Sequence, residues 1–221
     1  MRVCHITSAH PRHDVRIHFK ECLSLARAGH DVMLVVADGK GDAVDGEVAV
    51  YDVGMPANRA DRIVRVRARA ATIASALRAD VYHLHDPELL LAIPKLVRHG
   101  SKVIYDAHED VTKQLLSKPY LSSAAGRILA MLFALLEQCL LKSVHAVVAA
   151  TPSIAEHYTE KVPYVVTVNN YPRLDVLPHP RNAWQRNTLH VCYVGSISTI
   201  RGAEQMVRSI GLTRNRVRLR L

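Results

Sequence analysis

Histidines with carboxylates close by follow several short apolar runs of this sequence. Such groups occur within segments 8–14, 83–88 and 106–109. Imidazole and carboxylate side chains can exchange protons and hydrogen-bond hydroxyl-rich or anionic ligands. Asp86 also stands where a helix cap is favoured, and a lone loop histidine is more often a structural group than a catalytic one. The candidate cleft residues are His10, Arg12, Asp14, Arg16, His85, Asp86, His108 and Glu109.

The apolar runs alternate with helical patterns along the first 170 residues. Strand-like, β-branched runs occupy residues 3–7, 32–37, 48–53, 81–85, 103–106, 146–150 and 165–168. Helical periodicity marks residues 15–28, 59–79, 88–99 and 124–143. This alternation predicts an α/β, Rossmann-like doubly wound parallel sheet with helices on both faces. The candidate loops would then meet at the carboxyl edge of the sheet, where such folds bind ligands.

A metal site is an alternative use of the same residues. His83 and His85 lie on one face of a predicted strand, and Asp86, His108 and Glu109 could add ligands. Nothing in the spacing fixes four ligands on one centre, and an inward strand position also suits a core histidine. We expect no metal and no resident cofactor, and we keep a metal-dependent hydrolase built on His83, His85 and Asp86 as a remote alternative.

A second α/β unit begins near the end of the sequence. Residues 189–195 are strand-like, 196–202 form a turn, 203–212 have a helical pattern and 217–221 start another strand. Residues 171–187 contain Pro172, Pro178 and Pro180 and little periodicity, which favours a linker. We therefore predict a domain over 1–170, a linker over 171–187 and the start of a second domain over 188–221. Since ligands of two-domain α/β proteins bind between the domains, we expect these 221 residues to be inactive alone.

The composition limits the partners and the compartment. The net charge of +9 suggests an acidic or phosphate-bearing partner. Aromatic residues are only 5% and no nucleic-acid-binding motif occurs, so we exclude nucleic acid. The four cysteines form no CxxC pair, and no run is long enough for a signal sequence or a spanning helix. These features favour a cytoplasmic protein.

The helical stretch 59–79 has arginines beside an apolar stripe. Arg62, Arg65 and Arg69 line one edge of the stripe, which suits an anionic membrane surface. An ordinary helix covering the sheet is an equally good interpretation. Cytoplasmic location with peripheral binding to the inner face of the membrane is thus a hypothesis. The apolar run 128–136 is too short to span a bilayer and predicts a core helix.

Six fragments together carry a family resemblance. They are Asp14-Val-Arg-Ile, Leu25-Ala-Arg-Ala-Gly-His-Asp-Val, Asp80-Val-Tyr-His-Leu-His-Asp-Pro-Glu-Leu-Leu, Val103-Ile-Tyr-Asp-Ala-His-Glu, Ala149-Ala-Thr-Pro-Ser and Tyr193-Val-Gly-Ser-Ile-Ser-Thr-Ile-Arg-Gly. In this order the chain resembles the retaining glycosyltransferases of family 4, which have the GT-B fold. The resemblance covers the amino-terminal domain and the start of the donor-binding domain.

The resemblance implies transfer of a sugar from a nucleotide diphosphate sugar to a glycan or lipid-linked acceptor. His108 matches a histidine near the transferred sugar, and Arg201 matches a basic residue against the donor diphosphate. Gly195 and Ser196 belong to the same donor-side turn. Ser196 stands where many relatives have an arginine, and the first loop lacks the paired glycines common in the family, so Arg12 or Arg16 could hold the diphosphate instead. A non-catalytic module that binds a nucleotide sugar or glycan is the alternative function.

Overall fold

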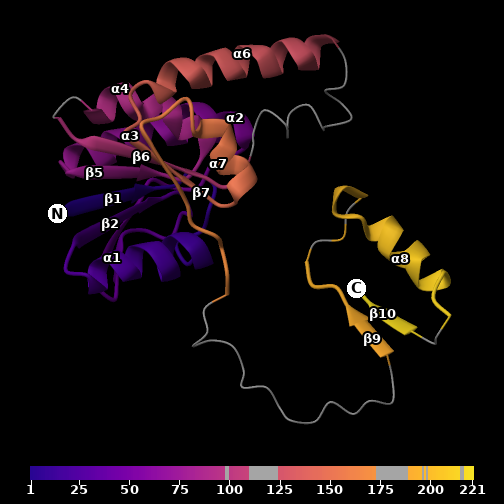
Figure 1. Ribbon diagram of the computed structural model, residues 1–221. Coiled ribbons are helices and arrows are strands. Elements are labelled where there is room, and N and C mark those ends of the chain that lie inside the picture. Colours follow the sequence, from indigo (N-terminus) through magenta and orange to yellow (C-terminus); the bar gives the residue numbers. More distant parts are fainter. Residues whose placement is uncertain (98–99, 110–123, 173–188, 196, 198, 215–216) are drawn as a thin grey trace. The chain divides into compact units, whose positions relative to one another are not determined.

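The computed structural model consists of two units, Met1–Tyr171 and Pro172–Leu221 (Figure 1). It describes residues 1–97, 100–109, 124–172, 189–195, 197, 199–214 and 217–221. The predicted linker over 171–187 lies almost wholly outside the described residues.

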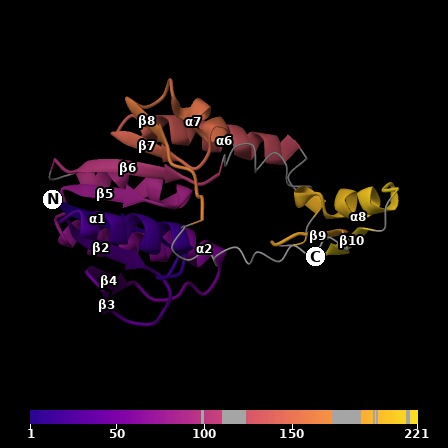
Figure 2. The ribbon, with the colours of Figure 1, turned by 60° about the horizontal axis from the view of Figure 1, so that its bottom comes forward.

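The first unit is built on one eight-stranded sheet. Its strands are β1 (Arg2–Ile6), β2 (Asp31–Val36), β3 (Ala43–Asp45), β4 (Val48–Asp52), β5 (Val81–Leu84), β6 (Lys102–Ala107), β7 (Ala146–Ala149) and β8 (Tyr164–Thr167). They lie in the order β3-β4-β2-β1-β5-β6-β7-β8 (Figure 2). Every neighbouring pair is parallel except β3 and β4. The predicted doubly wound Rossmann-like sheet is confirmed.

The antiparallel edge strand β3 was not predicted. It pairs with β4 through a tight turn in which Gly46 has a φ of +62°. The Asp45-Gly46 pair is a hairpin signal, because a turn of this kind needs a residue that tolerates positive φ. Strand β3 is only three residues long, so its pattern carried little weight beside the longer apolar runs.

The order of the strands reverses next to β1. From β1 the chain winds outward through β2 and β4 and then returns to place β5 on the other side of β1. Loops that follow β1 and β5 therefore leave the sheet in opposite directions and open a crevice between them. Ligands of open α/β sheets bind at such a switch point.

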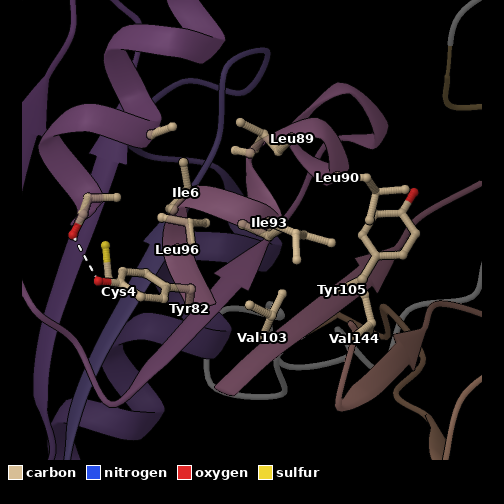
Figure 3. Close-up of a cluster of buried hydrophobic side chains, with 14 of the residues drawn as sticks. Cys4, Ile6, Tyr82, Leu89, Leu90, Ile93, Leu96, Val103, Tyr105 and Val144 are labelled. Carbon is tan, nitrogen blue, oxygen red and sulfur yellow. Dashed lines mark hydrogen bonds between the residues drawn. The ribbon is translucent and has the colours of Figure 1, made fainter. Parts of the chain in front are cut away.

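Helices cover both faces of this sheet. They are η1 (Val15–Cys22), α1 (Leu23–Arg27), α2 (Arg59–Asp61), η2 (Arg62–Val66), α3 (Arg67–Ala76), η3 (Pro87–Ala92), α4 (Ile93–Leu96), α6 (Ala124–Leu141) and α7 (Pro152–Tyr158). Helix α1 lies on one face, and α3, α4 and α6 lie on the other (Figure 1). The larger core, on the α3 face, contains Ile6, Tyr82, Leu90 and Tyr105, all buried (Figure 3). The smaller core, under η1 and α1, includes Ile17, Cys22 and Leu34.

Three predicted helices are divided into segments. The stretch predicted over 15–28 is the π-helical segment η1 followed by the α-helix α1. The stretch predicted over 88–99 is a 3-10 turn, η3, followed by the short helix α4, whose first turn contains Pro94. Proline lacks the N–H that would continue an α-helical ladder from η3. The stretch predicted over 59–79 ends at Ala76 and includes the π-helical segment η2.

Helix α6 differs from its prediction as a core helix. The side chains of Ile128, Met131, Leu132 and Leu135 are 58%, 62%, 56% and 55% exposed. These positions recur every three or four residues and so lie on one face of the helix. Helix α6 therefore presents an apolar stripe to the exterior of the unit. None of the helices in the described part of the chain is long and apolar enough to span a bilayer.

The second unit contains a parallel strand pair and one main helix. Its described elements are β9 (Leu189–Cys192), η7 (Thr199–Arg201), α8 (Ala203–Gly211) and β10 (Val217–Arg220). Strands β9 and β10 pair in parallel across α8, which makes a βαβ unit. No residue of α8 is buried.

Candidate functional site

The loops that follow β1, β5 and β6 meet at the switch point and line a cavity of about 580 Å³. Its polar wall comes from these loops and from Arg59 and Arg62, and its apolar wall comes largely from α6 and η3. The polar lining residues include His10, His85, Asp86, Glu88, His108 and Glu109. The apolar lining residues include Ile63, Leu90, Phe133, Leu136 and Leu140. A concave site with few convergent polar groups on an apolar wall is typical of small-molecule binding.

Asp86 fixes the loop that follows β1 to the loop that follows β5. Its Oδ2 atom accepts hydrogen bonds from Thr7 Oγ1 at 2.8 Å and from the backbone N–H of Ser8 at 2.6 Å. Its Oδ1 atom lies 3.2 Å from His10 Nδ1. Burial opposes ionisation of Asp86, but these hydrogen bonds outweigh it and lower the pKa to about 2. The same contact raises the pKa of His10, because the buried carboxylate favours the protonated imidazole beside it.

Asp106 is the centre of a second, deeper network. Arg16 donates to both of its oxygens, from Nε at 2.9 Å and from Nη2 at 2.7 Å. His85 Nδ1 and His108 Nε2 lie 3.2 Å and 2.9 Å from its Oδ2 atom. Burial opposes ionisation of Asp106, but these cationic and N–H neighbours keep its pKa below the usual range. Asp106 thus holds His108, which is partly exposed, at the cavity wall.

Beneath the cavity lies a cluster of four ionisable side chains. The cluster consists of His5 on β1, Glu21 on η1, His83 on β5 and His85 just after β5. Each side chain offers one potential ligand atom, and these four atoms lie within 4.8 Å of one another. Burial and the neighbouring His85 lower the pKa of His83 to about 3, and burial and the charge of Asp106 raise the pKa of Glu21 to about 9. A second group that could hold a metal, His85, Asp106 and His108, adjoins this cluster.

The structure separates the candidate residues into two classes. His10, His85, Asp86, His108 and Glu109 all line the cavity. Arg12, Asp14 and Arg16 do not belong to its lining. Asp86 also lies outside the histidine cluster, so the His83, His85 and Asp86 arrangement considered for a hydrolase is not formed.

Three loop residues have structural partners instead. Arg12 is buried and donates to Asp38 from Nε at 2.8 Å and Nη2 at 2.7 Å. Asp14 caps η1 by accepting the N–H groups of Arg16 and Ile17. Arg16 is buried against Asp106. The guanidinium groups of Arg12 and Arg16 are therefore committed to internal carboxylates, which is a poor arrangement for holding a diphosphate.

In the second unit, the predicted donor-side turn brings Gly195 and Arg201 together. Gly195 has a φ of +153°, and a Cβ atom there would lie 3.0 Å from Tyr193 Oη and 3.3 Å from Arg201 Nη1. The backbone conformation favours glycine at this position. Ser196 lies outside the described residues.

Comparison with known proteins identifies the family. Residues 22–163 match the profile described as the glycosyl transferase 4-like domain. The chain belongs to this family. The expected resemblance is confirmed. A search of curated protein sequences returned no significant match.

Solved structures similar to this glycosyl transferase 4-like chain share its fold. Sucrose-phosphate synthase from Thermosynechococcus elongatus superposes with a TM-score of 0.68 at 13% identity, over 99% of this chain and 61% of that one. The trehalose-6-phosphate synthase OtsA gives 0.59 at 12% identity, over 99% and 64%. A transferase from Siraitia grosvenorii in complex with UDP gives 0.58 at 8% identity, over 100% and 64%. The chain thus spans less than two thirds of the length of these structures.

Two residues of the first unit, both before the matched range 22–163, were missed as site residues. His5 lies in the middle of β1, where it pairs in register with His83, and Glu21 lies on η1. A histidine within an otherwise apolar strand is unusual, and this was the one weak indication in the sequence that His5 has a functional role. For Glu21 the sequence held no signal, because its proximity to β5 depends on how η1 crosses the sheet.

Proposed function

We propose that the intact protein transfers a sugar from a nucleotide diphosphate sugar to an acceptor, with retention of the anomeric configuration. The observation that carries the proposal is the convergence of His10, His85, Asp86 and His108 at the switch point of a glycosyl transferase 4-like domain. The similar transferase from Siraitia grosvenorii was crystallised with UDP, which supports a nucleotide donor.

In this proposal each candidate residue has a separate task. His108, held by Asp106, hydrogen-bonds a hydroxyl of the transferred sugar and fixes the reacting geometry. Arg201 stabilises the negative charge that grows on the leaving diphosphate, in place of a metal ion. The bond from the anomeric carbon to the diphosphate oxygen breaks, a bond to the acceptor oxygen forms, and the acceptor proton passes to the diphosphate. Gly195 lets the backbone approach the donor.

The first experiment is a screen of the intact protein for donor hydrolysis and transfer over nucleotide sugars. With the donor known, His108→Ala is expected to lower turnover by about 10- to 1,000-fold, because one positioned polar group contributes that much. His108 is partly exposed, so the free energy of unfolding should change little. His30→Ala, in the loop before β2 at the opposite edge of the sheet, is the matched control.

Unchanged turnover in the His108→Ala variant would refute the role of this histidine. A protein that binds a nucleotide sugar tightly but releases no product in the screen is instead a non-catalytic binding module. Detection of product separates the two functions directly.

We further propose that the acceptor is presented at an anionic membrane surface. Helix α6, which carries the exposed apolar stripe, shares the lining of one cavity with a basic element. Phe133 and Leu136 of α6 line it together with Arg59, Arg62 and Ile63. Arg65 and Arg69 are exposed, whereas Arg62 is partly buried with its Nε 2.8 Å from Glu88. An apolar face flanked by cations suits an interface with anionic lipid, where each arginine contributes about 1 kcal/mol.

Co-sedimentation with vesicles tests this surface. The protein should pellet with vesicles that contain phosphatidylglycerol and be released as salt is raised, because salt screens the attraction. Leu132→Ser with Leu135→Ser, and separately Arg65→Gln with Arg69→Gln, should each weaken binding. The charge-matched control is Arg27→Gln with Lys40→Gln, which alters exposed residues away from α6. Equal binding to neutral and anionic vesicles contradicts the role of the arginines.

A further inference from the structure

The cluster beneath the cavity has the donor atoms of a metal centre. Glu21 Oε2 lies 3.9 Å from His5 Nδ1, 3.9 Å from His83 Nδ1 and 3.8 Å from His85 Nε2. One carboxylate oxygen is therefore almost equidistant from three imidazole nitrogens. Two of these nitrogens, His5 Nδ1 and His85 Nε2, lie 2.9 Å apart.

These separations are close to those of a tetrahedral site. Ligand atoms bound at 2.0–2.1 Å to one Zn²⁺ ion stand about 3.4 Å apart. The three distances to Glu21 exceed this value by about 0.5 Å, and the distance between His5 and His85 falls short of it by about the same amount. All four donor atoms lie within 4.8 Å of one another, so metal binding requires them to close in on a common centre.

The hydrogen bonds around His85 fix which of its nitrogens is free to bind. Its Nδ1 atom faces the ionised carboxylate of Asp106 at 3.2 Å and so carries the proton. In the neutral ring, Nε2 then has a lone pair, and this atom points to His5 and Glu21. A carboxylate behind a ligating histidine is the usual outer partner of a metal site.

The cluster is poorly satisfied by protein atoms alone. His5 and His85 are fully enclosed, and His83 is 7% exposed. Among the described residues, neither oxygen of Glu21 accepts a hydrogen bond, although Arg16 Nε lies 3.1 Å from Oε1. Without a cation, protons relieve this crowding, because the pKa of Glu21 is raised to about 9 and His5 Nδ1 lies within hydrogen-bond distance of His85 Nε2. A divalent cation would displace these protons and bind the four donor atoms together.

We propose that His5, Glu21, His83 and His85 bind one structural Zn²⁺ ion. Three imidazole nitrogens and one carboxylate oxygen form a set that suits Zn²⁺, whereas Mg²⁺ and Ca²⁺ prefer oxygen ligands. All four positions belong to the protein, so the ion ties η1 to β1 and β5 and is closed to substrate. This differs from the metal-free site that the sequence alone led us to expect, and it is independent of the proposed transfer reaction.

Such an ion would also help to hold His108 in the cavity lining. It holds His85 through Nε2, His85 faces Asp106 through Nδ1, and Asp106 lies against His108. Zinc binding should therefore stiffen the loop that carries His108, in addition to stabilising the sheet.

Elemental analysis of the whole purified chain tests the site. After loading with Zn²⁺ and extensive dialysis, we expect about one zinc per chain. Co²⁺ in its place should give the visible absorption of a tetrahedral nitrogen and oxygen site. Chelation should lower the melting temperature, and Zn²⁺ but not Mg²⁺ should restore it.

Two variants assign the ligands. Glu21→Gln and His83→Gln should each lose the bound zinc and the cobalt spectrum, whereas His30→Gln, outside the cluster, should keep both. Circular dichroism checks that the variants fold. Wild-type protein that retains no zinc after loading would overturn the proposal even if both variants fail to fold. Full zinc occupancy in the folded Glu21→Gln and His83→Gln proteins would also overturn it, because the metal would then be bound elsewhere.

Discussion

Two aspartates beside the cavity, Asp86 and Asp106, are charged although they are buried. Asp86 and Asp106 are 3% and 0% exposed. Each stays ionised because several donors face it, including His10 and Ser8 for Asp86 and Arg16 for Asp106. Removal of one donor or of the carboxylate would leave buried polar groups without hydrogen-bond partners. The loss of folding free energy would then exceed the net contribution of the hydrogen bond itself. These carboxylates therefore fix the loops that carry the candidate site residues.

The Asp86 carboxylate should make stability depend on pH in a defined window, and its substitution should remove that dependence. Its folded pKa of about 2 lies below the unfolded value of about 4, so the ionised group contributes about 2 kcal/mol above pH 4. That contribution is lost as pH falls from 4 toward 2. Urea denaturation should show wild type more stable than Asp86→Asn at pH 5–7 and the difference shrinking below pH 4.

His10 sets the upper limit of the same window. Its raised pKa means that the imidazolium stabilises the fold below its unfolded pKa and that this part is lost as pH rises through the folded value. Coupling between His10→Gln and Asp86→Asn in a double-mutant cycle should accordingly be larger at pH 5.5 than at pH 8.5. Glu47→Gln, at an exposed position, serves as control.

A difference in stability between wild type and Asp86→Asn that does not change from pH 6 to pH 2.5 would contradict the lowered pKa of Asp86.

Among the elements, α3 shows how small residues position a helix on the sheet. Ala70 and Ala74 are fully buried, and with Val66 of η2 they form the face that packs on the strands. Ala68 on the same helix is exposed. The predicted apolar stripe is thus confirmed as a sheet-covering face, and the arginines line its edges.

Enlarging a buried alanine of α3 should destabilise the first unit. Ala70→Leu adds three methylene-sized groups where no space exists, and overpacking of this kind costs about 1–3 kcal/mol. Ala68→Leu on the exposed face should change stability by less than about 0.5 kcal/mol. Thermal and urea denaturation of the two variants make the comparison. Equal stability of both would mean that α3 does not pack tightly on the sheet.

At the scale of the whole molecule, the two units differ in how well they bury their elements. The first has a core on each face of its sheet. In the described part of the second, β9 and β10 pair with each other, and Leu189 and Val191 are 54% and 48% exposed. Two strands and one helix without a buried face are marginally stable in water.

Amide hydrogen exchange should therefore separate the units. Amides of β1, β2 and β5 should exchange slowly, through global unfolding, whereas those of β9, β10 and α8 should exchange within seconds to minutes. Mass spectrometry of the 221-residue chain measures both in one experiment. Protection of α8 equal to that of β1 would show that the second unit is buried by contacts beyond its own elements.

The sequence was sufficient for the order and type of most elements. Apolar runs such as 81–85 and helical patterns such as 15–28 report burial through local periodicity, and local spacing also identified the loops around His10, Asp86 and His108. Motif order was enough to indicate the family. Segments that depend on weaker local signals, such as β3 and the division at Pro94, were missed or simplified.

The side chains that meet in the site could not be paired from local sequence patterns. Arg16 and Asp106 lie far apart in the sequence, yet their pairing removes Arg16 from the cavity. His5 and His83 become neighbours through the register of β1 and β5, and Glu21 joins them because η1 crosses that face of the sheet. Periodicity records only whether a position is buried. The partner of a buried charge depends on register and on the direction of helices across the sheet, and these are set by packing of the whole unit.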